Sequence, residues 1–178
     1  FLGELEGITI APPPYTMTGR KEIKNNGAIT TTDEHLIICE TNDTKVTIDD
    51  GASPYMVTFN VPSWVQGTAS SNTTFQQTTI QYQYFTCKVS GGALTGNTRV
   101  VKQGDGILKL PNVNMTYTGE TDVWAGTLCF DGQLLHSPLW LNRFAELNSD
   151  GGHFLSIDAQ YGSVIRPGGA DKASSTTV

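Results

Sequence analysis

The sequence has little charge and no long apolar run. Asp, Glu, Lys and Arg make up only 16% of its 178 residues, well below the quarter that is usual in soluble domains. Acidic residues outnumber basic ones by 17 to 11, which argues against a nucleic-acid-binding protein because phosphate neutralisation needs a concentrated basic surface. No stretch of 18 apolar residues occurs, so we expect no membrane insertion.

Cysteine is also scarce, and its positions match no metal-binding or disulfide-rich pattern. Cys39, Cys87 and Cys129 are separated by 48 and 42 residues, spacings that no zinc motif has. Each lies in an apolar or strand-like run, which favours three small buried side chains; one disulfide across facing strands is the alternative. The sequence therefore predicts that folding needs no metal and no organic cofactor.

Strand-forming residues and turn signals fill the chain instead. The sequence is rich in β-branched Thr and contains 19 Gly and 8 Pro. Dipeptides that suit tight turns with positive φ occur at Asn26-Gly27, Asp50-Gly51, Asp105-Gly106, Asp131-Gly132 and Asp150-Gly151. Between these turns, the strongest strand candidates are residues 35–41, 45–49, 55–61 and 78–89.

These short runs predict a single all-β domain over residues 1–178. An antiparallel sandwich or jelly roll with at most one or two short helices suits many short strands with frequent turns, and no internal repeat of 20–50 residues is evident. The adjacent bulky residues Tyr84 and Phe85 indicate a bulge or a passage between sheets. A Pro-rich arm at about 1–19 and a flexible tail at about 167–178 are expected to flank the domain.

One segment, residues 137–148, has a helical pattern. Ser137 suits the capping position, and the proline that follows suits the first helical position. Trp140, Phe144 and Leu147 then follow at spacings that place them on one face of a short helix. We expect this face to pack on the sheet, so that Phe144→Ala would cost about 3–5 kcal/mol.

The sequence shows no set of residues that could act together in catalysis. His153, Ser156 and Asp158 are close in sequence, but on a strand His153 would point away from the other two. The remaining histidines, His35 and His136, lie too far apart for a local metal clip. We therefore predict a non-enzymatic protein, with no catalytic residue and no metal ligand.

Two tryptophans and three sequons are the candidate sites. Trp64 and Trp124 lie in polar surroundings, where an exposed indole beside amides could stack on a sugar ring; burial in the core is the alternative. Asn42, Asn72 and Asn114 each begin an Asn-x-Ser/Thr sequon and are candidate glycosylation sites.

The acidic, Thr/Asn/Gln-rich composition resembles that of virion proteins and of bacterial or phage surface proteins. The resemblance implies a structural subunit of a virus or phage particle, located in the virion or at an extracellular surface. Such a subunit would assemble with copies of itself or with other particle subunits through its arms. The alternative is a lectin-like attachment domain of a virion spike or bacterial adhesin, with a host glycan or receptor as its partner.

Overall fold

The computed structural model describes the backbone of residues 19–72 and 75–168, and the side chains of these residues except 64–82. The predicted arms at 1–19 and 167–178 lie outside the described residues, apart from Gly19, Pro167 and Gly168. Within the described ranges the chain forms nineteen strands and no helix.

The strands form three parallel sheets and one antiparallel hairpin. Sheet A contains β1 (Arg20–Glu22), β3 (Thr32–Cys39), β5 (Pro54–Asn60), β9 (Arg99–Gln103), β12 (Thr121–Val123), β15 (Leu139–Leu141) and β18 (Ile157–Ala159). Sheet B contains β2 (Ala28–Ile29), β4 (Thr44–Ile48), β8 (Thr86–Gly91), β10 (Ile107–Lys109), β13 (Thr127–Cys129), β16 (Glu146–Ser149) and β19 (Val164–Pro167). The short sheet contains β11 (Asn114–Met115), β14 (Gln133–Leu134) and β17 (His153–Phe154), and the hairpin consists of β6 (Ser63–Asn72) and β7 (Phe75–Tyr84).

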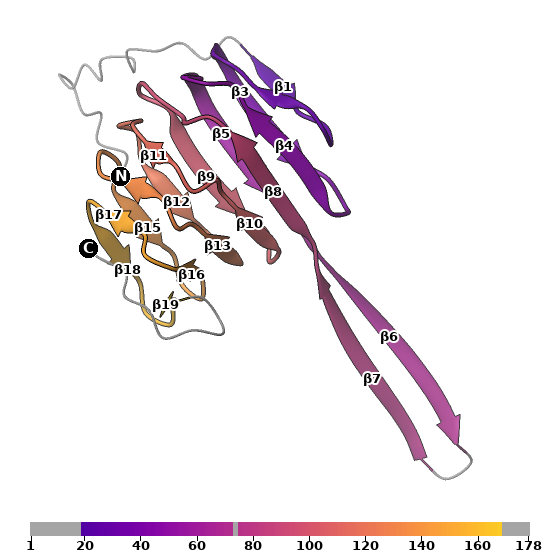
Figure 1. Ribbon diagram of the computed structural model, residues 1–178. Helices are drawn as coiled ribbons and strands as arrows, with labels where there is room; N and C mark the ends of the chain where they lie inside the picture. Colours follow the sequence, from indigo (N-terminus) through magenta and orange to yellow (C-terminus); the bar gives the residue numbers. More distant parts are fainter. Residues whose placement is uncertain (1–18, 73–74, 169–178) are drawn as a thin grey trace, which may run out of the picture.

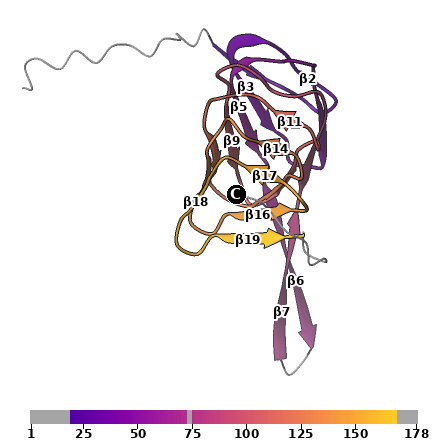
Figure 2. The same cartoon turned by 60° about the vertical axis from the view of Figure 1, so that its left-hand side comes forward.

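The chain winds as a parallel β-solenoid of about six turns (Figure 1). Each turn places one strand in sheet A and the next in sheet B, and every strand pairs with its equivalent one turn later. Figure 2 brings the C-terminal end forward and shows the coils closing around one interior.

This architecture shows that the predicted antiparallel sandwich or jelly roll is wrong. The expectation of no internal repeat of 20–50 residues also fails, because Leu36 pairs with Val57 and Val100 with Thr121, equivalent positions 21 residues apart. Parallel neighbours normally need a long crossover. Here the crossover between two strands of sheet A is itself a strand of sheet B, so the alternation along each strand looks the same as in an antiparallel fold.

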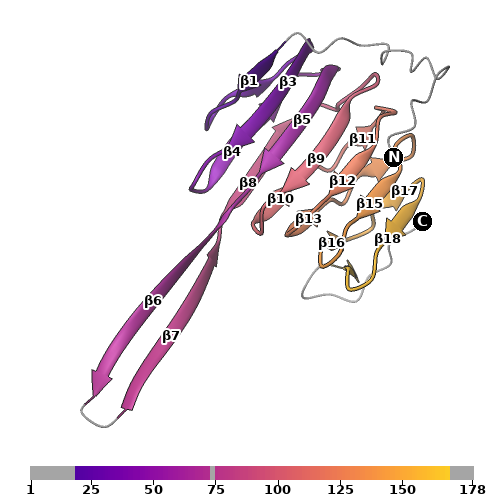
Figure 3. The same cartoon turned by 180° about the vertical axis from the view of Figure 1, so that it is seen from behind.

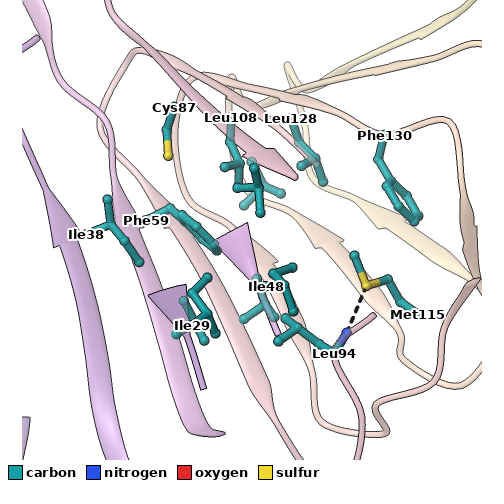
Figure 4. Close-up of a cluster of buried hydrophobic side chains, with 14 of the residues drawn as sticks. Ile29, Ile38, Ile48, Phe59, Cys87, Leu94, Leu108, Met115, Leu128 and Phe130 are labelled. Atoms are coloured by element: carbon teal, nitrogen blue, oxygen red, sulfur yellow. Dashed lines mark hydrogen bonds between the residues drawn. The ribbon is translucent and has the colours of Figure 1, made fainter. Parts of the chain in front are cut away.

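The core is built from columns of inward-facing side chains that stack between successive turns. In sheet A, Ile38 pairs with Phe59, and in sheet B, Leu108 pairs with Cys87 and Leu128; all five residues are buried. Figure 4 shows these side chains converging in the interior. Each turn must therefore be covered by its neighbours, as in other repeat folds.

The segment predicted as a helix is two strands and a corner. Trp140 lies in β15 with 38% of its surface exposed, and Leu147 lies buried in β16. Phe144 occupies the corner between them at φ 66°, and 69% of its surface is exposed. The three side chains share no common face because the chain reverses between them, so the predicted helical packing of Phe144 is wrong.

The predicted turns agree with the structure at three of their five positions. Asn26, Gly51 and Gly151 adopt positive φ, as their Asn-Gly and Asp-Gly dipeptides indicated, whereas Gly106 and Gly132 do not. The passage predicted at Tyr84 and Phe85 is also confirmed, because β7 of the hairpin ends at Tyr84 and β8 of sheet B begins directly after Phe85.

Only one of the three cysteines is buried. The Cys87 side chain points into the core, where burial raises its pKa to about 12. Cys129 is half-buried with a raised pKa, chiefly from burial, and Cys39 is exposed. All three are free thiols. The prediction of three buried cysteines therefore holds for Cys87 alone.

A buried lysine interrupts the apolar column of sheet A. Lys102 pairs with Phe59 and Val123, and its side chain is 1% exposed. Its ammonium group donates to the carbonyl oxygens of Gln103, Gly104 and Ala125, at 2.9, 2.6 and 3.0 Å. These carbonyls belong to the corners of two successive turns, so the ammonium group links the two corners through hydrogen bonds. Burial lowers the pKa of Lys102 to about 8.

The depressed pKa of Lys102 makes stability depend on pH. The unfolded lysine keeps its proton up to its ordinary pKa of 10.5, whereas the folded one loses it near 8. The free energy of unfolding should therefore rise, by about 1 kcal/mol between pH 7 and 9. Above the ordinary thiol pKa of 9.0 the trend is opposed, because unfolded Cys87 ionises while the folded thiol stays protonated to about pH 12.

Urea unfolding at pH 7, 8 and 9 measures this dependence. The Lys102→Met variant should lose the rise with pH. Lys109→Met, which removes an exposed lysine on sheet B, should keep it. An identical rise in both variants would show that Lys102 is not its source.

Candidate ligand-binding groove on sheet A

The outward-facing side chains of sheet A form rows that run across the strands. Successive side chains of a strand point to opposite faces, and the parallel register aligns equivalent positions. One row contains Arg20, His35, Met56 and Arg99, in the order of the paired strands. This arrangement gathers polar residues that are far apart in the sequence.

A second row ends at a tryptophan. Cys39, Asn60 and Gln103 are paired partners on three successive strands. Trp124 follows β12, and its backbone N–H donates to the Lys102 carbonyl at 2.9 Å, so it continues the row by one turn. Its indole is 54% exposed. The alternative that Trp124 anchors the core is therefore excluded.

These rows enclose a shallow groove of about 450 Å³, which we call the sheet-A groove. Its lining residues are Arg20, His35, Ile37, Cys39, Met56, Thr58, Asn60, Arg99, Val101, Gln103 and Trp124. The set combines one exposed indole, two side-chain amides and two guanidinium groups, and it includes no carboxylate. This is the mixture of apolar surface and a few polar groups that is typical of small-ligand sites.

The charges in the groove differ in how strongly they are paired. Arg99 lies 2.6 Å from the Asp122 carboxylate and 3.6 Å from that of Glu120, and the bond to Asp122 is the main cause of its raised pKa. Within the described residues Arg20 forms no ion pair. Arg20 is therefore the cation of the groove that is best placed to meet an acidic group on a ligand.

His35 is held neutral at the floor of the groove. Its Nε2 atom lies 2.7 Å from Thr58 Oγ1, and the residue is 9% exposed. Burial, with a smaller contribution from the charge of Arg20, lowers the pKa of His35. At neutral pH the imidazole thus contributes hydrogen bonding to the groove rather than positive charge.

The hairpin leaves the solenoid beside this groove. Val61, just after β5, donates its N–H to the Gln103 carbonyl at 3.0 Å, and Phe85 donates to the Pro62 carbonyl at 3.3 Å. At the hairpin base Ser63 Oγ lies 3.4 Å from Asp105 Oδ2. From this base the two strands project away from the stack, as Figure 3 shows from behind.

The other predicted ligand residue, Trp64, lies in β6, opposite Gln83 of β7. Its side chain is outside the described set, so the structure brings only Trp124 to the groove. Arg20, Asn60 and Gln103 were not predicted. Alternation along each strand places them outward, but only the pairing register reveals that they converge.

A second hollow, of about 370 Å³, lies on the other side of the hairpin base. Its lining includes the exposed rings of Tyr84 and Phe144 and the carboxylates of Asp105 and Glu146. Glu146 is paired with Arg166 at 3.1 Å. Exposed aromatic residues thus line both hollows: Trp124 in the sheet-A groove, and Tyr84 and Phe144 in the second.

Two of the sequons lie on the solenoid and one lies in the hairpin. Asn42 is exposed in the turn between β3 and β4, and Asn114 is exposed at the start of β11. Asn72 ends β6, and its side chain lies outside the described set. Their glycosylation stays a prediction.

The structure also places the residues considered for catalysis. His153 lies in β17 of the short sheet and Asp158 in β18 of sheet A, so they belong to different sheets. Among the described residues no group of three or more His, Cys, Asp or Glu side chains could hold a metal ion. Nor does the described part of the chain contain a helix long and apolar enough to span a membrane.

Comparisons with known proteins identify one repeat. Residues 100–128 match the model of the passenger-associated-transport-repeat, and this stretch runs from β9 through a full turn to β13. No curated protein and no solved structure matches the chain significantly.

The repeat and the solenoid together fit an autotransporter-passenger-like surface protein, and the repeat indicates an extracellular or surface-exposed location. Neither supports a virion location. The predicted capsid subunit also loses its structural basis, because it assumed jelly-roll packing.

Proposed function

We propose that this chain is part of a surface attachment protein whose sheet-A groove binds a host glycan or receptor and catalyses no reaction. The observation that carries the proposal is the exposed indole of Trp124 in line with the amides of Asn60 and Gln103. An indole offers a flat apolar face to the C–H side of a sugar ring, and amides satisfy its hydroxyl groups.

The charge of the groove favours acidic sugars over neutral ones. The chain as a whole carries a net charge of −6, yet the groove is lined by Arg20 and Arg99 and by no carboxylate. A carboxylate on the ligand would meet Arg20 without competing with an existing ion pair. Charge-assisted hydrogen bonds of this kind are stronger than neutral ones.

A glycan array followed by titration of the best ligand tests the proposal. We expect Trp124→Ala to weaken binding about 30-fold, because an exposed aromatic side chain that stacks on the ligand contributes about 2 kcal/mol. Trp140→Ala is the matched control: Trp140 is also an exposed indole on the outer face of sheet A, one turn further on, but does not line the groove. Its affinity should stay within about twofold of the parent chain.

A second variant tests the preference of the groove for acidic glycans. Arg20→Gln should weaken binding of an acidic glycan and leave that of its neutral counterpart unchanged. Equal losses in Trp124→Ala and Trp140→Ala, or no glycan bound by the parent chain, would rule out the groove as the binding site.

A further inference from the structure

We propose that the hairpin binds a second copy of this chain by pairing the β7 edges of two hairpins into one four-stranded antiparallel sheet. In the described residues β6 and β7 pair only with each other, over ten successive positions. Their outer edges therefore present rows of backbone N–H and C=O groups without a strand partner, which is the template for strand addition. The proposal does not depend on the sheet-A groove.

The hairpin carries none of the usual devices that protect a strand edge. Residues 63–84 contain no Asp, Glu, Lys, Arg or Pro, and the register of β6 on β7 runs without a bulge. Charged residues, prolines and bulges are what normally block edge-to-edge pairing. An isolated two-stranded hairpin is also only marginally stable in water, so two further strands would stabilise it.

The sequences of the two strands distinguish their edges. β7 reads Phe-Gln-Gln-Thr-Thr-Ile-Gln-Tyr-Gln-Tyr, which is rich in β-branched and aromatic residues and has no Gly. β6 contains Gly67, Ala69 and three serines, which are weaker strand formers. High strand propensity with no charge is typical of segments that pair with their own copies. The β7 edge is therefore the better pairing surface.

A second copy fits this edge both by symmetry and by charge. Two β7 strands related by a two-fold axis run antiparallel, and such an interface closes at two copies. Within residues 19–168 all charged residues lie outside the hairpin, and acidic residues outnumber basic ones by 14 to 10, so the solenoid bodies repel each other. A ten-residue strand spans about 34 Å, several times the screening length of about 8 Å at physiological salt, so the hairpins can meet while the bodies stay apart.

The oligomeric state of the whole chain tests the pairing. Analytical ultracentrifugation should show a concentration-dependent dimer. The triple variant Q77K/T79K/Q81K places three positive charges on β7, where like charges oppose each other across the new interface. The triple variant Q66K/T68K/S70K is the matched control, because these positions pair directly with the β7 positions and lie at the same levels of the hairpin.

We expect the β7 variant to raise the dimer dissociation constant more than tenfold and the β6 variant to change it less than threefold. Mixing Q77K/T79K/Q81K with Q77E/T79E/Q81E should restore the dimer, which a folding defect would not allow. A monomeric parent chain, or a dimer that neither triple variant weakens, would overturn the proposal.

Discussion

Phe59→Ala should destabilise the solenoid by about 3–5 kcal/mol. Phe59 is fully buried in the inward column of sheet A, where it pairs with Ile38 on one side and Lys102 on the other. Truncation leaves a cavity between two turns that the flanking backbone ladders cannot close. Because each turn is covered only by its neighbours, we expect the loss to weaken the turns on both sides.

Equilibrium urea unfolding followed by circular dichroism measures this cost. The same substitution at Phe144 is the control: its ring is 69% exposed at a corner, so Phe144→Ala should change the free energy of unfolding by less than about 1 kcal/mol. A cost of 3 kcal/mol or more at Phe144 would show that burial in the column is not what makes the Phe59 ring stabilising.

Gly126→Ala should cost about 2–4 kcal/mol, from two sources that add. Gly126 has a φ of 71°, which disfavours any residue with a Cβ atom. A Cβ atom there would also lie 2.4 Å from the Gly106 carbonyl oxygen and 2.5 Å from that of Gly104, both in the preceding turn. These contacts are with backbone, so the two turns must separate to relieve them.

Gly51→Ala separates the two contributions to the Gly126 result. Gly51 has nearly the same φ, 69°, but a Cβ atom there would have no neighbour within 4 Å. This variant should cost only the conformational term, about 1 kcal/mol. Equal midpoints of urea unfolding for the two variants would show that close stacking of the corners contributes nothing.

The amino-acid sequence predicts most strands and several turns of this protein, but not the corner at Phe144. Runs such as 45–49 and 55–61 were recognised as strands because alternation and β-branched residues favour an extended backbone whatever its partner is. Turns at Asn26, Gly51 and Gly151 followed from the few residue types that tolerate positive φ. The exposure of Trp124 was one of two alternatives that its polar surroundings left open.

Which strands pair depends on how the turns stack on one another. A side-chain period of two is the same for parallel and antiparallel neighbours, so the sandwich and the solenoid were equivalent at that level. The repeat is not visible in the sequence, because each turn has only a few inward-facing positions and different apolar residues occupy them. One of these positions is even occupied by a lysine, Lys102. In addition, the hairpin separates Val57 from its partner Val100.

The candidate groove shows the same division. Arg20, Asn60 and Trp124 belong to different turns, and nothing local in the sequence connects them. Stacking of the turns at the strand spacing of about 4.8 Å brings them onto one face. The stacking of the turns also determines which apolar residues are buried. Leu147 occupies an inward-facing position in its strand, whereas Phe144, three residues earlier, lies at an exposed corner. Position within the coil decided their burial, and helical spacing did not.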